Sequence, residues 1–194
     1  MNTKLINSLR RRIASTSVGP STARRMGPKG TIKAARKYLA GLKLASFAKK
    51  TEKKFQAVLN RATLRFVNHL PRRARHWGAA RKFLNIFLRG VLYNRYLCEH
   101  YNLYRIERWL ELPLDSHVAK CLHREKGSGI LPRWKTVIGL DKDTNQRYQE
   151  FATEVAKRKK YNTYRIHLDV YYWRHEFVAP NSSYNRTRRT RLHR

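Results

Sequence analysis

Apolar side chains recur every three or four positions over most of residues 31–159, a spacing that gathers them on one face of an α-helix. The pattern predicts one helix in IKAARKYLAGLKLASF, capped by Thr31, and a second from Thr51 until Pro71 stops it. The longest pattern covers about 78–100, where a broad apolar stripe indicates a central helix.

Shorter elements are predicted after this helix. A short helix is expected at 104–110, and Asp115 or Ser116 is suited to cap another at 116–125. Asp143 followed by Gln146 resembles a capping box, which predicts a helix at about 144–159.

Residues 163–173, TYRIHLDVYYW, alternate only weakly and would lack an evident partner as a strand. We therefore expect a short helix or an extended packing segment there. The predicted fold class is all-α, with six or seven helices in one nucleic-acid-binding domain over 31–176.

Both ends of the chain are basic. Residues 1–30 contain turn signals at Gly19-Pro20 and Gly27-Pro28, and we expect an extended basic arm that adds nothing to the core. Residues 177–194 form a second basic tail.

The first nineteen residues also permit a second interpretation. They are rich in Arg and Ser, lack acids and place Leu5, Ile6, Leu9 and Ile13 on one side of a helix, as in a mitochondrial transit peptide. A basic arm of the mature protein that lies along phosphates is the alternative, and both remain open at this point.

The charge of the chain indicates its partner. Lys and Arg number 44 against 12 Asp and Glu, and the first 98 residues contain only one acid, Glu52. Such a charge opposes compaction unless a polyanion supplies counter-charge. The basic residues are spread over the whole chain rather than along one amphipathic helix, which favours nucleic acid over a membrane surface. The 22 aromatic residues nevertheless allow a real core.

Phosphate contacts are expected from the two basic ends and from the arginine-rich segment before the central helix, whose N-terminus adds a positive dipole end. The predicted contact residues are Arg10, Arg11, Arg12, Arg24, Arg25, Lys29, Arg72, Arg73, Arg75, Arg81, Arg186, Arg188, Arg189 and Arg191.

No metal site or cofactor is predicted. Cys98 and Cys121 lie far apart, and His117 and His123 are too widely spaced for a helical ligand pair. Tyrosines accompany arginines at 93–104 and 161–172, where they can stack on unpaired bases or pack in the core.

The strings WGAARKFLNIFLRGVLYNRYL and ELPLDSHVAKCL, within residues 77–122, resemble the central region of the helix-hairpin-helix DNA glycosylase superfamily, in particular the archaeal 8-oxoguanine glycosylase/lyase type. The resemblance continues more weakly to residue 173. It implies a glycosylase-like fold in which Asp115 is catalytic and caps a helix, and in which Lys82 is the nucleophile. The glycine-rich hairpin of common members is absent, and only Gly78 remains of it.

Two functions follow. One is a structural RNA-binding subunit of a large ribonucleoprotein, such as a mitochondrial or cytoplasmic ribosome, with rRNA and neighbouring proteins as partners. The other is a DNA-repair N-glycosylase/lyase acting on duplex DNA. Charge on nearly every segment favours the first, because an enzyme that scans DNA must also release it. An architectural protein that compacts DNA is a weaker third, since the apolar core is larger than that function needs.

Overall fold

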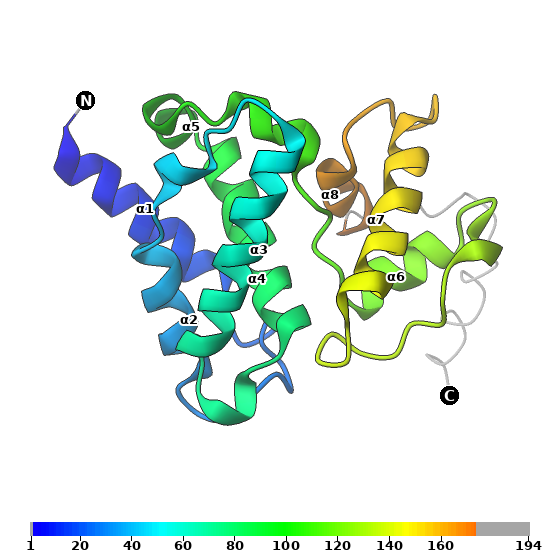
Figure 1. Cartoon of the computed structure of the whole chain (residues 1–194), viewed down its shortest axis with the longest axis horizontal. Coiled ribbons are helices and arrows are strands. Elements are labelled where there is room, and N and C mark those ends of the chain that lie inside the picture. The colour runs from blue at the N-terminus through cyan, green and yellow to red at the C-terminus, as the bar shows by residue number, and fades with distance from the viewer. Residues whose placement is uncertain (1, 174–194) are drawn as a thin grey trace, which may run out of the picture.

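The computed structural model describes residues 2–173, in which all regular secondary structure is helical and no strand occurs. Two groups of helices lie side by side (Figure 1). The first group comprises α1 (Thr3–Ser17), α2 (Thr31–Ala40), α3 (Glu52–His69), α4 (Trp77–Tyr93) and α5 (Arg95–Tyr101). The second comprises α6 (Ser116–His123), α7 (Lys142–Lys157) and α8 (Leu168–Trp173). The all-α prediction is confirmed.

Short 3₁₀ helices lie between these α-helices. They are η1 (Leu44–Phe47), η2 (Arg72–Ala74), η3 (Tyr104–Trp109), η4 (Ser128–Ile130) and η5 (Arg165–His167). The 163–173 segment is thus helical, as the first of its two alternatives proposed.

Each group has its own apolar core. In the first, Phe55 and Phe66 of α3 and Phe83 and Phe87 of α4 are fully buried. In the second, Tyr148 of α7 is fully buried, and its hydroxyl donates to the carbonyl of Pro132 at 2.9 Å. Burial raises the pKa of Tyr148 to about 12.

The expected extended arm at 1–30 is wrong. Its first half is α1, which packs against α2, α4 and α5. Ile6, Ala14 and Val18 are buried in the first core. Leu9 and Ile13 are partly buried against it, whereas Leu5 is exposed. Gly90 of α4 permits this approach, since a Cβ there would lie 2.8 Å from the side chain of Ile13. Helix α1 is therefore part of the first core.

Several helix ends differ from the sequence-based expectation. The 78–100 helix is broken at Asn94, whose side chain accepts from the Leu97 amide at 3.1 Å and starts α5. Gly30 precedes α2 in the cap position expected for Thr31, and Asp141 caps α7 in place of Asp143. The cap at Thr51 is confirmed.

A buried ion pair joins the two groups. Arg81 of α4 donates to both carboxylate oxygens of Glu111, at 2.6 and 2.7 Å. The same guanidinium donates to Asn60 and Thr63 of α3, each at 3.0 Å. Asn145 of α7 donates to Glu111 at 3.3 Å, so one carboxylate connects α3, α4 and α7.

The charge of Glu111 is stabilised by this network. Burial alone would raise the pKa of its carboxyl, but the charges of Arg81 and Arg165 and the hydrogen bonds from Arg81 and Asn145 hold it below the ordinary value. A carboxyl with a lowered folded pKa stabilises the fold above its unfolded pKa of about 4.3, and that contribution is lost as the pH falls through the folded value.

We therefore predict that Glu111→Gln costs about 3–5 kcal/mol of unfolding free energy at pH 7, because Arg81 is left as an unpaired buried charge. Urea unfolding measures this. Between about pH 6 and about pH 3, which lie on either side of the unfolded pKa, the wild type should lose stability more steeply than the variant. Glu99→Gln, which removes an exposed partner of Arg95, is the matched control and should change little. Equal losses in the two variants would contradict the role of Glu111.

Candidate active site and nucleic-acid interface

A cavity of about 470 Å³ lies where α1, α4, α8 and the start of α6 meet. Its wall combines polar and charged side chains with apolar ones. The lining residues are Thr16, Ser17, Ser21, Thr22, Lys82, Ile86, Arg89, Pro113, Asp115, Asp169, Val170 and Trp173.

Lys82 and Asp115 form an ion pair in this cavity. The Lys82 side chain is only 7% exposed, and its Nζ lies 3.1 Å from Oδ2 of Asp115 and 3.5 Å from the carbonyl oxygen of Thr22. Oδ1 of Asp115 accepts from the amides of His117 and Val118, both at 3.0 Å. One carboxylate thus caps α6 with one oxygen and holds the lysine with the other.

The position of Lys82 depends on the close seating of the first turn of α4. A Cβ at Gly78 would lie 2.1 Å from the carbonyl oxygen of Val137 and 2.7 Å from Cβ of Leu140. No larger side chain fits there, so the start of α4 can rest directly on the segment that leads into α7. One turn later the helix delivers Lys82 to the cavity.

A second ion pair, between Arg89 and Asp169, also lines the cavity. Arg89 follows Lys82 by two helical turns on the same face of α4. Burial lowers the pKa of Arg89. At the rim, Trp173 is 56% exposed, and its ring centroid lies 4.5 Å from that of His117.

The Lys82 and Asp115 pair has the geometry that an activated amine needs. A lysine is nucleophilic only when neutral, and an adjacent base within hydrogen-bond reach can take its proton. Asp115 occupies that place. Its helix-capping bonds use the other oxygen, so its orientation is fixed while Oδ2 faces Nζ of Lys82.

Neither Arg89 nor Asp169 was identified as a site residue from the sequence. A signal was available for Arg89, because its spacing of seven from Lys82 places both on one helix face. No such signal exists for Asp169, which reaches the cavity only through the folding of α8 against α6.

The predicted phosphate contacts divide into three sets. Exposed positions are found for Arg11, Arg12, Arg24, Arg25, Lys29, Arg72, Arg73 and Arg75, and Arg10 is partly buried. Arg186, Arg188, Arg189 and Arg191 lie outside the described residues. The prediction for Arg81 is wrong, since its guanidinium is buried against Glu111 and is not available to a phosphate.

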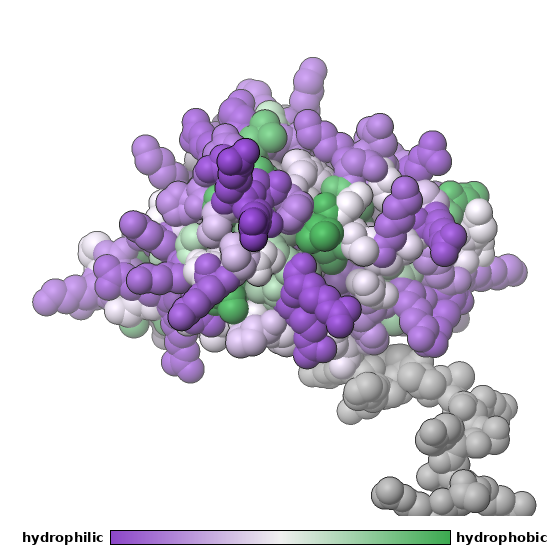
Figure 2. Space-filling model, turned by 90° about the horizontal axis from the view of Figure 1, so that it is seen from below, coloured by the Kyte–Doolittle hydropathy of each residue, from purple (hydrophilic) through white to green (hydrophobic). Residues whose placement is uncertain are grey.

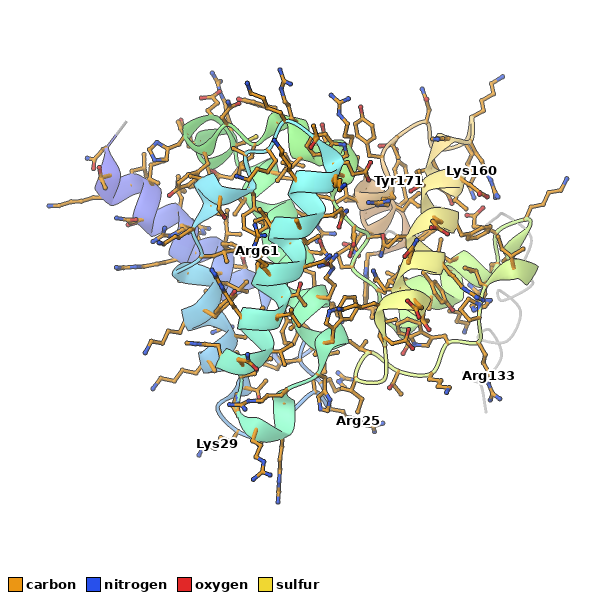
Figure 3. The ribbon with its side chains drawn as sticks, viewed as in Figure 1. Arg25, Lys29, Arg61, Arg133, Lys160 and Tyr171 are labelled. Atoms are coloured by element: carbon orange, nitrogen blue, oxygen red, sulfur yellow. The ribbon has the colours of Figure 1, made fainter. Side chains whose placement is uncertain are left out.

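The exposed cations lie on both groups of helices. In Figure 3, Arg25 and Lys29 lie at the lower end of the first group, and Arg133 and Lys160 lie on the second. Figure 2 shows the lower face, where hydrophilic side chains cover most of the surface. Four of the acids, Glu111, Asp115, Glu125 and Asp169, are paired with cations within the fold.

No family model, curated protein or solved structure matches this chain. Within residues 2–173, no group of three or more His, Cys, Asp or Glu side chains is placed to hold a metal ion. No helix in that part of the chain is long and apolar enough to cross a membrane.

Arg72, Arg73 and Arg75 lie together just before α4, and we predict that they contact phosphates. Replacing all three by Gln should lower affinity for a nucleic-acid duplex and reduce the slope of log K against log salt by about 2.7, or about 0.9 per lost contact. Fluorescence anisotropy at several salt concentrations measures both. The matched control replaces Lys120, Arg124 and Lys126, which are exposed on and after α6. An equal loss in the control would show that only total charge matters.

Proposed function

We propose that the protein is a nucleic-acid N-glycosylase/lyase that acts on duplex DNA, with Lys82 as nucleophile and Asp115 as its proton acceptor. The observation that carries this proposal is the 3.1 Å contact of Lys82 with Asp115 in a cavity. The resemblance to helix-hairpin-helix glycosylases implies these same two residues, which are 33 positions apart in the chain. Their meeting in a partly open cavity supports a shared chemical role.

In the proposed reaction, Asp115 accepts a proton from Nζ of Lys82, and the neutral amine attacks C1′ of the damaged nucleoside. The new C–N bond forms as the bond from C1′ to the base breaks, and the base leaves with the bonding electron pair and takes up a proton. Opening of the sugar then gives an imine between Lys82 and C1′. Asp115 returns its proton to the departing base, and the carboxylate restored in this way stabilises the cationic character of the sugar.

The charged residues that line the cavity are paired with one another, as Lys82 with Asp115 and Arg89 with Asp169, so the cavity suits an uncharged ligand. Arg89 is neutralised by Asp169, and the hydroxyls of Thr16 and Ser17 donate to carbonyls of their own helix. These groups therefore set the shape of the cavity more than its charge. The phosphate charge of the substrate is left to the exposed arginines outside.

A structural RNA-binding subunit of a ribonucleoprotein, in a mitochondrial or cytoplasmic particle, is the second candidate. It is supported by exposed Lys or Arg on α1, α2, α3, α5, α6 and α7, which is broader than one DNA-contacting face requires. A protein embedded in RNA and held by neighbouring proteins would use such a surface on several sides. Its test is whether the native chain sediments in a high-mass particle that nuclease disperses.

The enzyme proposal predicts a covalent adduct. With an abasic DNA duplex and borohydride, the wild type should be trapped through a lysine imine, and Lys82→Gln should abolish the adduct. Asp115→Asn should slow trapping by about 10²- to 10⁴-fold, as expected for loss of a proton-transferring group. Denaturing gel electrophoresis measures the adduct.

Two further variants make this test specific. Lys82→Arg keeps a cation beside Asp115 but cannot form an imine, so it should remain folded and give no adduct. Lys120→Gln removes an exposed lysine of α6 and should be trapped like the wild type. Absence of an adduct from the folded wild type, or an adduct that persists without Lys82, would refute the enzyme proposal and leave the ribonucleoprotein candidate.

A further inference from the structure

A groove of about 500 Å³ lies between η3, the end of α7 and η5. It shares no lining residue with the cavity of Lys82 and Asp115. Its wall combines an aromatic ring with cations and neutral polar groups. Among its lining residues are Arg108, Thr153, Lys157, Asn162, Tyr164 and His167.

Three rings form a row that begins at Tyr164 and His167 in this groove and ends at Tyr93 outside its lining. Tyr164 is 47% exposed, and its ring centroid lies 6.2 Å from that of His167. His167 is stacked against Tyr93, with centroids 5.6 Å apart and planes 12° apart. Tyr93 is itself 48% exposed, so two tyrosine rings of the row are open to solvent.

The middle ring of the row is held in place at both nitrogens. Nδ1 of His167 lies 2.6 Å from the Tyr93 hydroxyl, and Nε2 lies 3.0 Å from the Glu107 carboxylate. Glu107 is the acidic residue among those that line the groove, and its carboxylate contacts the His167 ring. The ring row is thus preorganised, and it does not have to be assembled when a ligand binds.

The floor of the groove is set by Arg165. Its guanidinium donates to the carbonyls of Leu110 and Trp109, both at 2.9 Å, and to the hydroxyl of Thr153 at 3.1 Å. These bonds occupy Arg165, so the charge available to a ligand comes from Arg108 and Lys157, which are both exposed.

We propose that this groove binds one nucleotide of an unpaired strand, with the base stacked on Tyr164 and the adjoining phosphate contacted by Arg108 and Lys157. Aromatic faces beside cations are the arrangement by which proteins hold single strands with little sequence preference. The proposal goes beyond the proposed function, because it requires neither Lys82 nor Asp115. It adds a preference for unpaired strand at a site apart from the chemistry.

The test is fluorescence anisotropy of the full chain with a labelled deoxythymidine oligonucleotide of about 12 residues, long enough to cover the site of one binding module. Tyr164→Leu should weaken this binding about 5- to 150-fold, the range that loss of one stacked base gives. Tyr164→Phe retains the ring and should bind like the wild type. Tyr96→Leu removes a tyrosine of similar exposure that does not line the groove, and is the matched control.

The charged half of the site is tested separately. Replacing Arg108 and Lys157 by Gln should reduce the salt slope for the oligonucleotide by about 1.4, or about 0.7 per phosphate of a single strand. The Tyr164→Leu variant should bind a fully paired duplex as the wild type does.

Two results would overturn the inference. One is an unchanged oligonucleotide affinity in Tyr164→Leu, and the other is an equal loss for oligonucleotide and duplex. The outcome is separable from that of the enzyme proposal, because Lys82→Arg should bind the oligonucleotide normally whether or not the wild type forms an adduct.

Discussion

The buried pair of Arg81 and Glu111 is the contact on which the remaining architecture depends. It lies where the two cores meet, and its two charges are tied to α3, α4 and α7 by further hydrogen bonds. A chain with so much positive charge resists compaction, and each cation that is taken inside needs a specific anion. Here that anion also fixes how one group of helices meets the other.

The same pair sets the geometry of the candidate active site. Lys82 follows Arg81 directly, so anchoring the guanidinium fixes the rotation of α4 and turns the lysine toward the cavity. Asp115 follows Glu111 by four residues, through Leu112, whose amide and carbonyl are both bonded to Gln149 of α7. Both partners of the reactive pair are therefore held by one short, buried scaffold.

Local signals in the sequence were sufficient for much of the fold. The 3.6-residue periodicity located the helices, and side-chain caps at Thr51 and Asp115 were recognisable because they act within three residues. The extended arm was predicted from charge and turns, but burial of Ile6 and Ala14 decided the outcome. Arg81 was assigned to the surface because its partner lies 30 positions away. The pairing of Lys82 with Asp115 was implied only by resemblance, and the exposure of each tyrosine could not be derived from spacing at all.

The folding of α1 has a consequence for how this chain can mature. Thr16, Ser17, Ser21 and Thr22 form one wall of the cavity, and Arg36 of α2 is bonded to the carbonyl of Val18. A leader peptidase that cut after this segment would open the cavity to solvent on that side and remove an apolar covering from the first core. The stretch whose composition resembles a targeting signal is therefore also one wall of the cavity and part of the first core.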